Sequence, residues 1–85
     1  KFIDKRNADR PAGSYTTKLF REGVNKIAKK VGEEAVELII ESKDQNDSLF
    51  LNEAADLLYH VVVLLSSRGK KIEDVIAVLK GRHSE

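Results

Sequence analysis

The chain has 85 residues, no cysteine and a formal net charge of +1. This length predicts one domain with a small stability margin, which oligomerisation would raise. The balanced charge gives no reason to expect nucleic acid or a membrane surface as a partner, and the lack of cysteine excludes disulfides and thiolate metal sites. The longest apolar run, Val61 to Leu65, is too short to span a bilayer. A reducing cytoplasm is compatible with this composition, and we expect that location.

Residues 1–13 are predicted to form a short arm or interdomain connector. They contain the only proline, Pro11, followed by Gly13. We expect at most one helical turn there, around Phe2 and Ile3. The chain lacks an initiator Met, which favours a processed product or a domain excised from a longer protein. Residues 14–85 form the predicted domain.

Two helices are predicted in the first half of this domain. Ser14 is a suitable N-cap for a short helix that Gly23 ends. A long helix follows to about Lys43, where apolar residues recur at helical spacing: Val24, Ile27, Val31, Ala35 and Leu38.

The second half predicts two more helices. Asp47 or Ser48 is expected to cap a second long helix, which runs to about Arg68 with Gly69 as its C-cap. A last helix over residues 71–80 carries an apolar face, and Gly81 is expected to loosen its end. That face consists of Ile72, Val75, Ile76 and Leu79. We therefore predict an all-α fold: a long antiparallel helical hairpin with short flanking helices.

Acidic residues intrude on the apolar face of the first long helix. A helix turns by about 100° per residue, so with Ile27 at zero Glu34 falls at about −20°, inside the apolar arc. Glu37 lies at its border at about −80°, Glu41 returns to about −40°, and Glu33 lies farther round.

The second long helix repeats this pattern. With Leu57 at zero, Glu53 lies at about −40°, His60 at about −60° and Asp56 near −100°. The acids of both helices thus occupy the same flank of the apolar stripe, and antiparallel pairing would bring the flanks together. Buried carboxylates are costly and repel one another, so we expect a cation to compensate them.

The residue types indicate which cation. Carboxylates with only one nearby histidine favour Mg²⁺, for which Mn²⁺ can substitute. The helical di-iron pattern needs Glu-x-x-His, whereas Glu53 is followed by Asp56, which argues against iron. Such a site predicts metal-assisted attack of water on a phosphate chain. The alternative is that these glutamates are solvated surface residues, as we expect for Glu22 and Glu73, and for Glu41 both interpretations stay open.

The acidic motifs also carry a family resemblance. "GEEAVE" followed by "NEAAD" matches E-E-x-x-E and E-x-x-D, the pattern of all-α nucleotide pyrophosphohydrolases of the MazG-like superfamily. Four segments resemble phosphoribosyl-ATP pyrophosphohydrolase of histidine biosynthesis: "SYTTKLF", "KVGEEAVE", "NEAADLLYHVVVLL" and "RH". The resemblance covers Ser14 to His83.

This resemblance implies a reaction, its metal and its partners. Phosphoribosyl-ATP and water would give phosphoribosyl-AMP and pyrophosphate, with Mg²⁺ required. By motif position Glu34, Glu37, Glu53 and Asp56 would be the metal ligands, and Glu33 would bind metal or orient the attacking water. A homodimer of helical hairpins, with a four-helix-bundle core, is implied. The arm resembles the connector that follows a phosphoribosyl-AMP cyclohydrolase domain in bifunctional versions, although a stand-alone enzyme is the alternative.

Several polar residues are substrate-binding candidates, each with a structural alternative. Lysines and an arginine would bind phosphates, whereas ion pairs or a helix-end charge explain them equally well. Hydroxyl and ring side chains would contact the substrate, whereas capping or core packing is the alternative. The candidates are Ser14, Thr16, Lys18, Lys30, Tyr59, His60 and Arg82, the last with its neighbour His83.

The second long helix is apolar almost all the way round between Leu57 and Leu65. One partner helix covers only a stripe of about 100°, which leaves Val62 and Val63 outside it. We therefore expect a second copy of the chain to cover them. Two rival functions remain: a pyrophosphohydrolase of other nucleoside triphosphates, and a non-catalytic dimeric helical interaction module.

Overall fold

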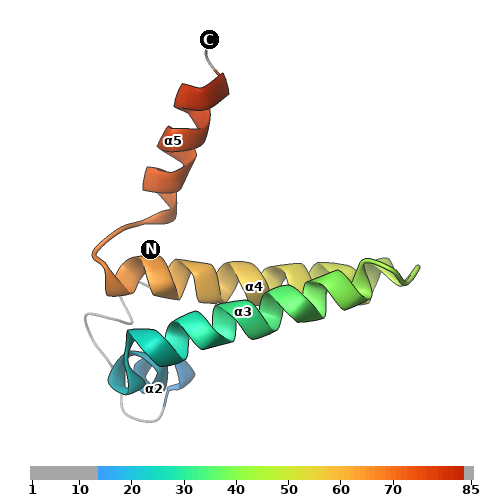
Figure 1. The fold of residues 1–85 in the computed structure, drawn as a ribbon, viewed down its shortest axis with the longest axis horizontal. Coiled ribbons are helices and arrows are strands. Elements are labelled where there is room, and N and C mark those ends of the chain that lie inside the picture. Colours follow the sequence, from blue (N-terminus) through green and yellow to red (C-terminus); the bar gives the residue numbers. More distant parts are fainter. Residues whose placement is uncertain (1–13, 84–85) are drawn as a thin grey trace.

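Four helices make up the part of the chain that the computed structural model describes, residues 14–83. They are α2 (Tyr15–Glu22), α3 (Val24–Glu41), α4 (Asp47–Ser67) and α5 (Ile72–His83). Helices α3 and α4 lie side by side, α2 packs at the end where α3 begins, and α5 extends away from them (Figure 1). The all-α prediction is confirmed for these residues. The predicted arm, with its turn around Phe2 and Ile3, lies outside them.

The boundaries of α2 follow from two local interactions. The Ser14 hydroxyl accepts a hydrogen bond from the Thr17 backbone N–H at 2.9 Å, which confirms the predicted N-cap. Gly23 has a φ of 97° and separates α2 from α3. This backbone conformation is unfavourable for a residue with a Cβ, so glycine permits the sharp change of direction here.

The ends of α4 differ slightly from the prediction. Its N-cap is Asn46, whose side chain accepts from the Leu49 N–H at 3.1 Å, so the expected cap at Asp47 or Ser48 is wrong by one or two positions. Asn is as good a cap as Asp or Ser, and it comes first in the chain. At the other end the Lys70 N–H donates to the Leu65 carbonyl, and Gly69 has a φ of 72°. Both features are typical of a glycine-terminated helix.

Helix α5 continues beyond its predicted end. Gly81 lies within the helix, which reaches His83. Three basic residues in its last turn, Lys80, Arg82 and His83, interact favourably with the C-terminal end of the helix dipole. That stabilisation is comparable to the cost of one glycine, about 1 kcal/mol, so the expected loosening at Gly81 is wrong.

The core is small and draws one residue from each of three helices. Leu19 of α2, Ile27 of α3 and Val63 of α4 are the fully buried apolar side chains, and Val63 is 0% exposed. Val63 is therefore covered within one chain, so the expectation that a second copy covers it is wrong, whereas Val62 is half-buried and its place at an interface stays a prediction. The physical reason is α2, which covers this flank of α4 together with the beginning of α3.

Much apolar surface stays exposed on the other elements. Helix α4 is long and apolar enough to cross a membrane by length and composition, although it carries three acids and a histidine and packs along α3. The residues that stay exposed in this single chain include Val36, Ile39, Ile40, Leu51, Leu58, Val75, Ile76, Val78 and Leu79. Helix α5 contributes no buried residue, and on its predicted apolar face Ile72 is half-buried while Val75, Ile76 and Leu79 are exposed.

Candidate functional site

A cluster of carboxylates forms between α3 and α4. Glu34, Glu53 and Asp56 each place one oxygen within 4.8 Å of the others, with Glu34 and Glu53 half-buried and Asp56 exposed. These residues come from the two acidic motifs, and the pairing of the helices brings them together. The donor set consists only of carboxylate oxygens, which suits a hard divalent cation such as Mg²⁺.

The environment of this cluster disfavours the ionised form of Glu53. Burial raises the pKa of the Glu53 carboxyl, and the charges of Glu37, Asp56, Glu34 and Glu41 raise it further. Each of these negative neighbours disfavours the ionised form, and a cation would remove the penalty. The repulsion among the acids therefore acts on Glu53, where it raises the pKa of the carboxyl.

The remaining acids of the first motif surround the cluster. Glu37 is exposed and acts on Glu53 through its charge, but it is not one of the three residues whose oxygens converge. Glu33 is exposed, is not one of the three converging residues, and lies 3.5 Å from the Lys30 ammonium. The direct metal contact of Glu37 and the role of Glu33 stay predictions.

Lys30 forms ion pairs with two of these acids. Its ammonium lies 3.5 Å from Glu33 and 3.6 Å from Glu34, one helical turn away on α3. Burial lowers the pKa of Lys30, but Tyr15, which is partly ionised where lysine titrates, and the two glutamates outweigh burial and raise it. Lys30 thus stays charged and neutralises part of the cluster, as the ion-pair alternative expects.

Glu41 is half-buried one turn beyond Glu37. Its Oε1 atom is buried and has no hydrogen-bond partner within the described residues. The helical wheel puts Glu41 at about −40° and leaves a solvated position open, and the structure shows it half-buried. A buried ionised oxygen needs a compensating group, so Glu41 adds to the demand of this region for a cation or a donor.

Two hydrogen bonds join α2 to α4 beside the cluster. The Tyr15 hydroxyl lies 2.8 Å from Nε2 of His60, and the Thr16 hydroxyl contacts the Tyr59 hydroxyl. His60 is 6% exposed, and its Nδ1 lies 2.7 Å from the backbone carbonyl of Asp56. A carbonyl only accepts, so Nδ1 carries the proton, and in the neutral ring Nε2 accepts from Tyr15.

Aromatic contacts reinforce this junction. The rings of Tyr15 and Tyr59 stack with centroids 6.2 Å apart, and both meet the His60 ring edge-on. Thr16 is buried, and Tyr59 packs against the core. These groups already have partners within the chain, so the structural alternative explains Thr16, Tyr59 and His60, and their contact with substrate stays a prediction.

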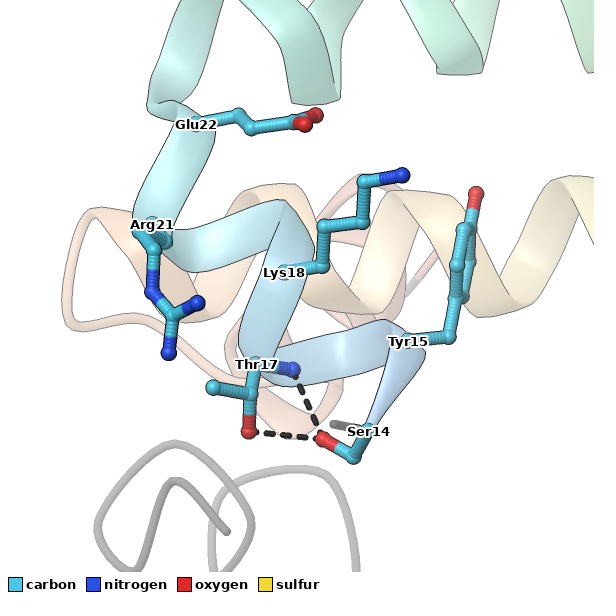
Figure 2. Close-up of a pocket in the computed structure, with 6 residues that line it drawn as sticks. All are labelled: Ser14, Tyr15, Thr17, Lys18, Arg21 and Glu22. Atoms are coloured by element: carbon cyan, nitrogen blue, oxygen red, sulfur yellow. Dashed lines mark hydrogen bonds between the residues drawn. The ribbon is translucent and has the colours of Figure 1, made fainter. Parts of the chain in front are cut away.

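A pocket of about 500 Å³ lies along α2. Figure 2 shows the Lys18 ammonium and the Tyr15 hydroxyl pointing toward the same side of the helix, with Arg21 on its other flank. The Ser14 hydroxyl is occupied by the cap and by a 2.6 Å hydrogen bond to the Thr17 hydroxyl. The pocket thus offers two cations, of which only Lys18 was predicted from the sequence.

The predicted site residues at the chain end lie elsewhere. Arg82 and His83 belong to α5, which extends away from the paired helices (Figure 1). Both stand in its basic last turn, as the helix-end alternative expects. A role over the phosphates stays a prediction.

Sequence reasoning missed Tyr15 and Arg21. Tyr15 belongs to the quoted word "SYTTKLF" and precedes Lys18 by three positions, which places both on one helical face. That spacing was the available signal. Nothing in the local sequence indicates that the Tyr15 hydroxyl reaches His60, 45 positions later.

Fold and site together define an α-helical protein in which two paired helices gather carboxylates at one point, with a cationic pocket on an adjoining helix. Residues 1–83 match the family described as phosphoribosyl-ATP pyrophosphohydrolase. The chain belongs to this family.

Individual relatives agree with this assignment. The chain is 55% identical over 83 residues to the histidine biosynthesis bifunctional protein HisIE of Bacteroides thetaiotaomicron and 57% identical over 83 residues to that of Bacillus subtilis. The matches include 98% of this chain, but only 41% and 40% of those relatives. A phosphoribosyl-ATP pyrophosphatase of Lacticaseibacillus casei is 45% identical over 84 residues, covering 99% of this chain and 76% of the relative. The chain thus spans about two fifths of the bifunctional relatives.

Proposed function

We propose that this chain hydrolyses phosphoribosyl-ATP to phosphoribosyl-AMP and pyrophosphate, with Mg²⁺ as cofactor. The observation that carries the proposal is the convergence of Glu34, Glu53 and Asp56 within 4.8 Å. Membership of the phosphoribosyl-ATP pyrophosphohydrolase family supports the substrate and the reaction. The name of the Lacticaseibacillus casei relative, phosphoribosyl-ATP pyrophosphatase, describes the same activity.

The residues divide into two groups in this proposal. Glu34, Glu53 and Asp56 hold the cation, Glu37 completes its ligands, and Mn²⁺ can replace Mg²⁺ because the donors are all oxygen. When bound, the ion neutralises phosphate charge and lowers the pKa of a bound water. Glu33, which is exposed and paired with Lys30, is available to orient the attacking water.

Lys18 and Arg21 bind the phosphate groups in the pocket on α2. They are three positions apart on one helix, and both line the same hollow. Lys18 points to the side of Tyr15 and Arg21 lies on the other flank of α2, so the two cations would meet different phosphate oxygens of a polyphosphate chain (Figure 2). Tyr15 borders the same pocket, and its hydroxyl contacts His60, which hydrogen-bonds to the backbone carbonyl of Asp56. Tyr15 and His60 therefore connect the pocket to the part of α4 that carries the acids.

The experiment is pyrophosphate release from phosphoribosyl-ATP, measured with and without Mg²⁺. Deoxynucleoside triphosphates tested in parallel separate this function from that of a general nucleotide pyrophosphohydrolase. Glu53→Gln removes one charge from the cluster, and Glu73→Gln, at an exposed position on α5, is the matched control. Release without Mg²⁺, or equal rates for Glu53→Gln and Glu73→Gln, would overturn the proposal, and no release at all would favour the non-catalytic module.

We infer further that two copies pair through their exposed apolar faces to form a four-helix-bundle core. Val36, Ile39 and Ile40 form one exposed stripe on α3, and Leu51 and Leu58, seven positions apart, form another on α4. Three fully buried apolar side chains are few for a stable domain, so covering these stripes would add most of the missing burial. Light scattering at micromolar concentration measures the mass, and a well-folded monomer would contradict this inference.

The bifunctional relatives suggest one more partner and a cellular context. A fused cyclohydrolase domain ahead of residue 1 is the extension that we propose for the natural protein, since HisIE relatives are more than twice as long as the matched stretch. A cytoplasmic location fits a biosynthetic enzyme with a small-molecule substrate. Immunodetection of the natural protein in cell fractions tests both its size and its location.

A further inference from the structure

Tyr15 is the one described side chain that belongs both to the pocket wall and to the contact with the acid-bearing helix. Its ring lines the hollow beside Lys18, and its hydroxyl reaches His60 Nε2 at 2.8 Å. The ring is 48% exposed, so it lies at a surface that a ligand reaches. Figure 2 shows the hydroxyl at the far end of the side chain, away from the α2 backbone.

His60 connects this contact to the backbone of α4, the helix that carries Glu53 and Asp56. Its Nδ1 donates to the backbone carbonyl of Asp56 at 2.7 Å, and the carboxylate of the same residue is one of the three converging acids. His60 is 6% exposed and held by two aromatic rings, so it has little freedom to turn. With Nδ1–H committed to the carbonyl, Nε2 is left as an acceptor, and the Tyr15 hydroxyl supplies the donor that it needs.

We infer that Tyr15 is a positioning residue for the hydrolytic site. Acting through His60, it fixes the position of the substrate pocket on α2 relative to the carboxylate cluster on α3 and α4. This inference rests on the proposed function, because it assigns Tyr15 a part in the same reaction. A short helix of eight residues has little stability of its own, so its placement depends on such tertiary contacts. Loss of the hydroxyl leaves both groups of residues intact but misaligns them.

The kinetic test compares Tyr15→Phe with the wild type on phosphoribosyl-ATP and Mg²⁺. We expect kcat to fall about tenfold, within the range that small misplacements of bound groups produce, while KM changes by less than about twofold. A residue that only contacts substrate would raise KM instead. Turnover within about twofold of the wild type would overturn the inference while leaving the proposed function in place.

A double-variant cycle tests whether Tyr15 acts through His60. His60→Asn keeps an amide donor at the place of Nδ1 and removes the acceptor at Nε2. Adding Tyr15→Phe to this background should change kcat by less than about twofold, because coupled residues are not additive. A full tenfold further loss would show that Tyr15 acts independently of His60 and would overturn the inference.

A spectroscopic arm keeps the test independent of activity. In ¹⁵N NMR spectra of the histidine side chains, Tyr15→Phe should move the His60 Nε2 resonance toward that of an imidazole nitrogen without a donor. Tyr59→Phe removes the neighbouring hydroxyl of the same α2–α4 contact and should leave that resonance in place. An unchanged Nε2 resonance in Tyr15→Phe would refute the contact, whereas a wild type that releases no pyrophosphate would refute the proposed function instead.

Discussion

Replacing Val63 by Glu should unfold the protomer, whereas the same change at Leu58 should separate two copies and leave each folded. Val63 is 0% exposed and packs against Leu19 and Ile27, while Leu58 lies on the same helix and is 57% exposed. A glutamate in the Val63 position has no partner in the core cluster. Both variants introduce the same glutamate side chain on α4, one at a buried and one at an exposed position, so their folded stabilities compare the two environments.

The magnitude for Val63→Glu follows from its complete burial. A fully buried carboxyl has its pKa raised by up to about 3–5 units, which is about 4–7 kcal/mol once the pH exceeds the folded pKa and about 3–4 kcal/mol at pH 7. A domain of 85 residues is expected to have a total stability of only about 4–13 kcal/mol. The variant should therefore be unfolded or close to unfolding. For Leu58→Glu we expect wild-type helical content and a halved mass.

Urea titration followed by circular dichroism, with light scattering at the same concentration, is the assay. The pH adds a second check with a definite sign. The introduced carboxyl has a higher pKa folded than unfolded, so its penalty is complete above the folded pKa and disappears as pH falls toward the unfolded value of about 4.3. The deficit of Val63→Glu should thus be smaller at pH 5 than at pH 8. Equal unfolding midpoints for the two variants would refute the placement of Val63 in the protomer core.

Three further outcomes are expected. Glu53→Gln and Glu37→Gln should each lower pyrophosphate release at least about 100-fold, with metal-free stability unchanged or higher, and near-normal turnover in both would contradict the metal assignment. The pKa of Glu53 is raised, so protons should compete with Mg²⁺, and the affinity measured by calorimetry should weaken as the pH falls toward that raised pKa. Protonation also removes the repulsion at Glu53 in the metal-free fold, and an affinity independent of pH would argue against Glu53 as a ligand. Gly69→Ala should lower the free energy of unfolding by about 1–2 kcal/mol, because the φ of Gly69 is 72°. Gly81→Ala should raise it by about 0.5–1 kcal/mol, because Gly81 lies inside α5 with open space for the added Cβ. Equal thermal shifts for the two variants would contradict these backbone assignments.

The sequence by itself determined the features that depend on near neighbours. Ser14 caps α2 because its hydroxyl meets an N–H three residues on, and Gly69 ends α4 through its own backbone freedom. The same local rule placed Glu34 within the apolar stripe of α3, since helical rotation relates residues three and four apart. It also indicated that Glu53 would lie on the matching flank of α4. The family motif, E-E-x-x-E followed by E-x-x-D, is likewise a pattern of spacing between near neighbours in the sequence.

Tertiary structure alone decided which helix covers which face. The helical wheel assigned Val63 to an uncovered side, but α2 packs there through Leu19, and no short-range pattern records that contact. The hydrogen bond between Tyr15 and His60 joins positions 45 residues apart, so it exists only once α2 has docked on α4. Helical periodicity fixes the angle of a side chain around its own axis, whereas burial depends on what lies opposite, and that is set by long-range packing.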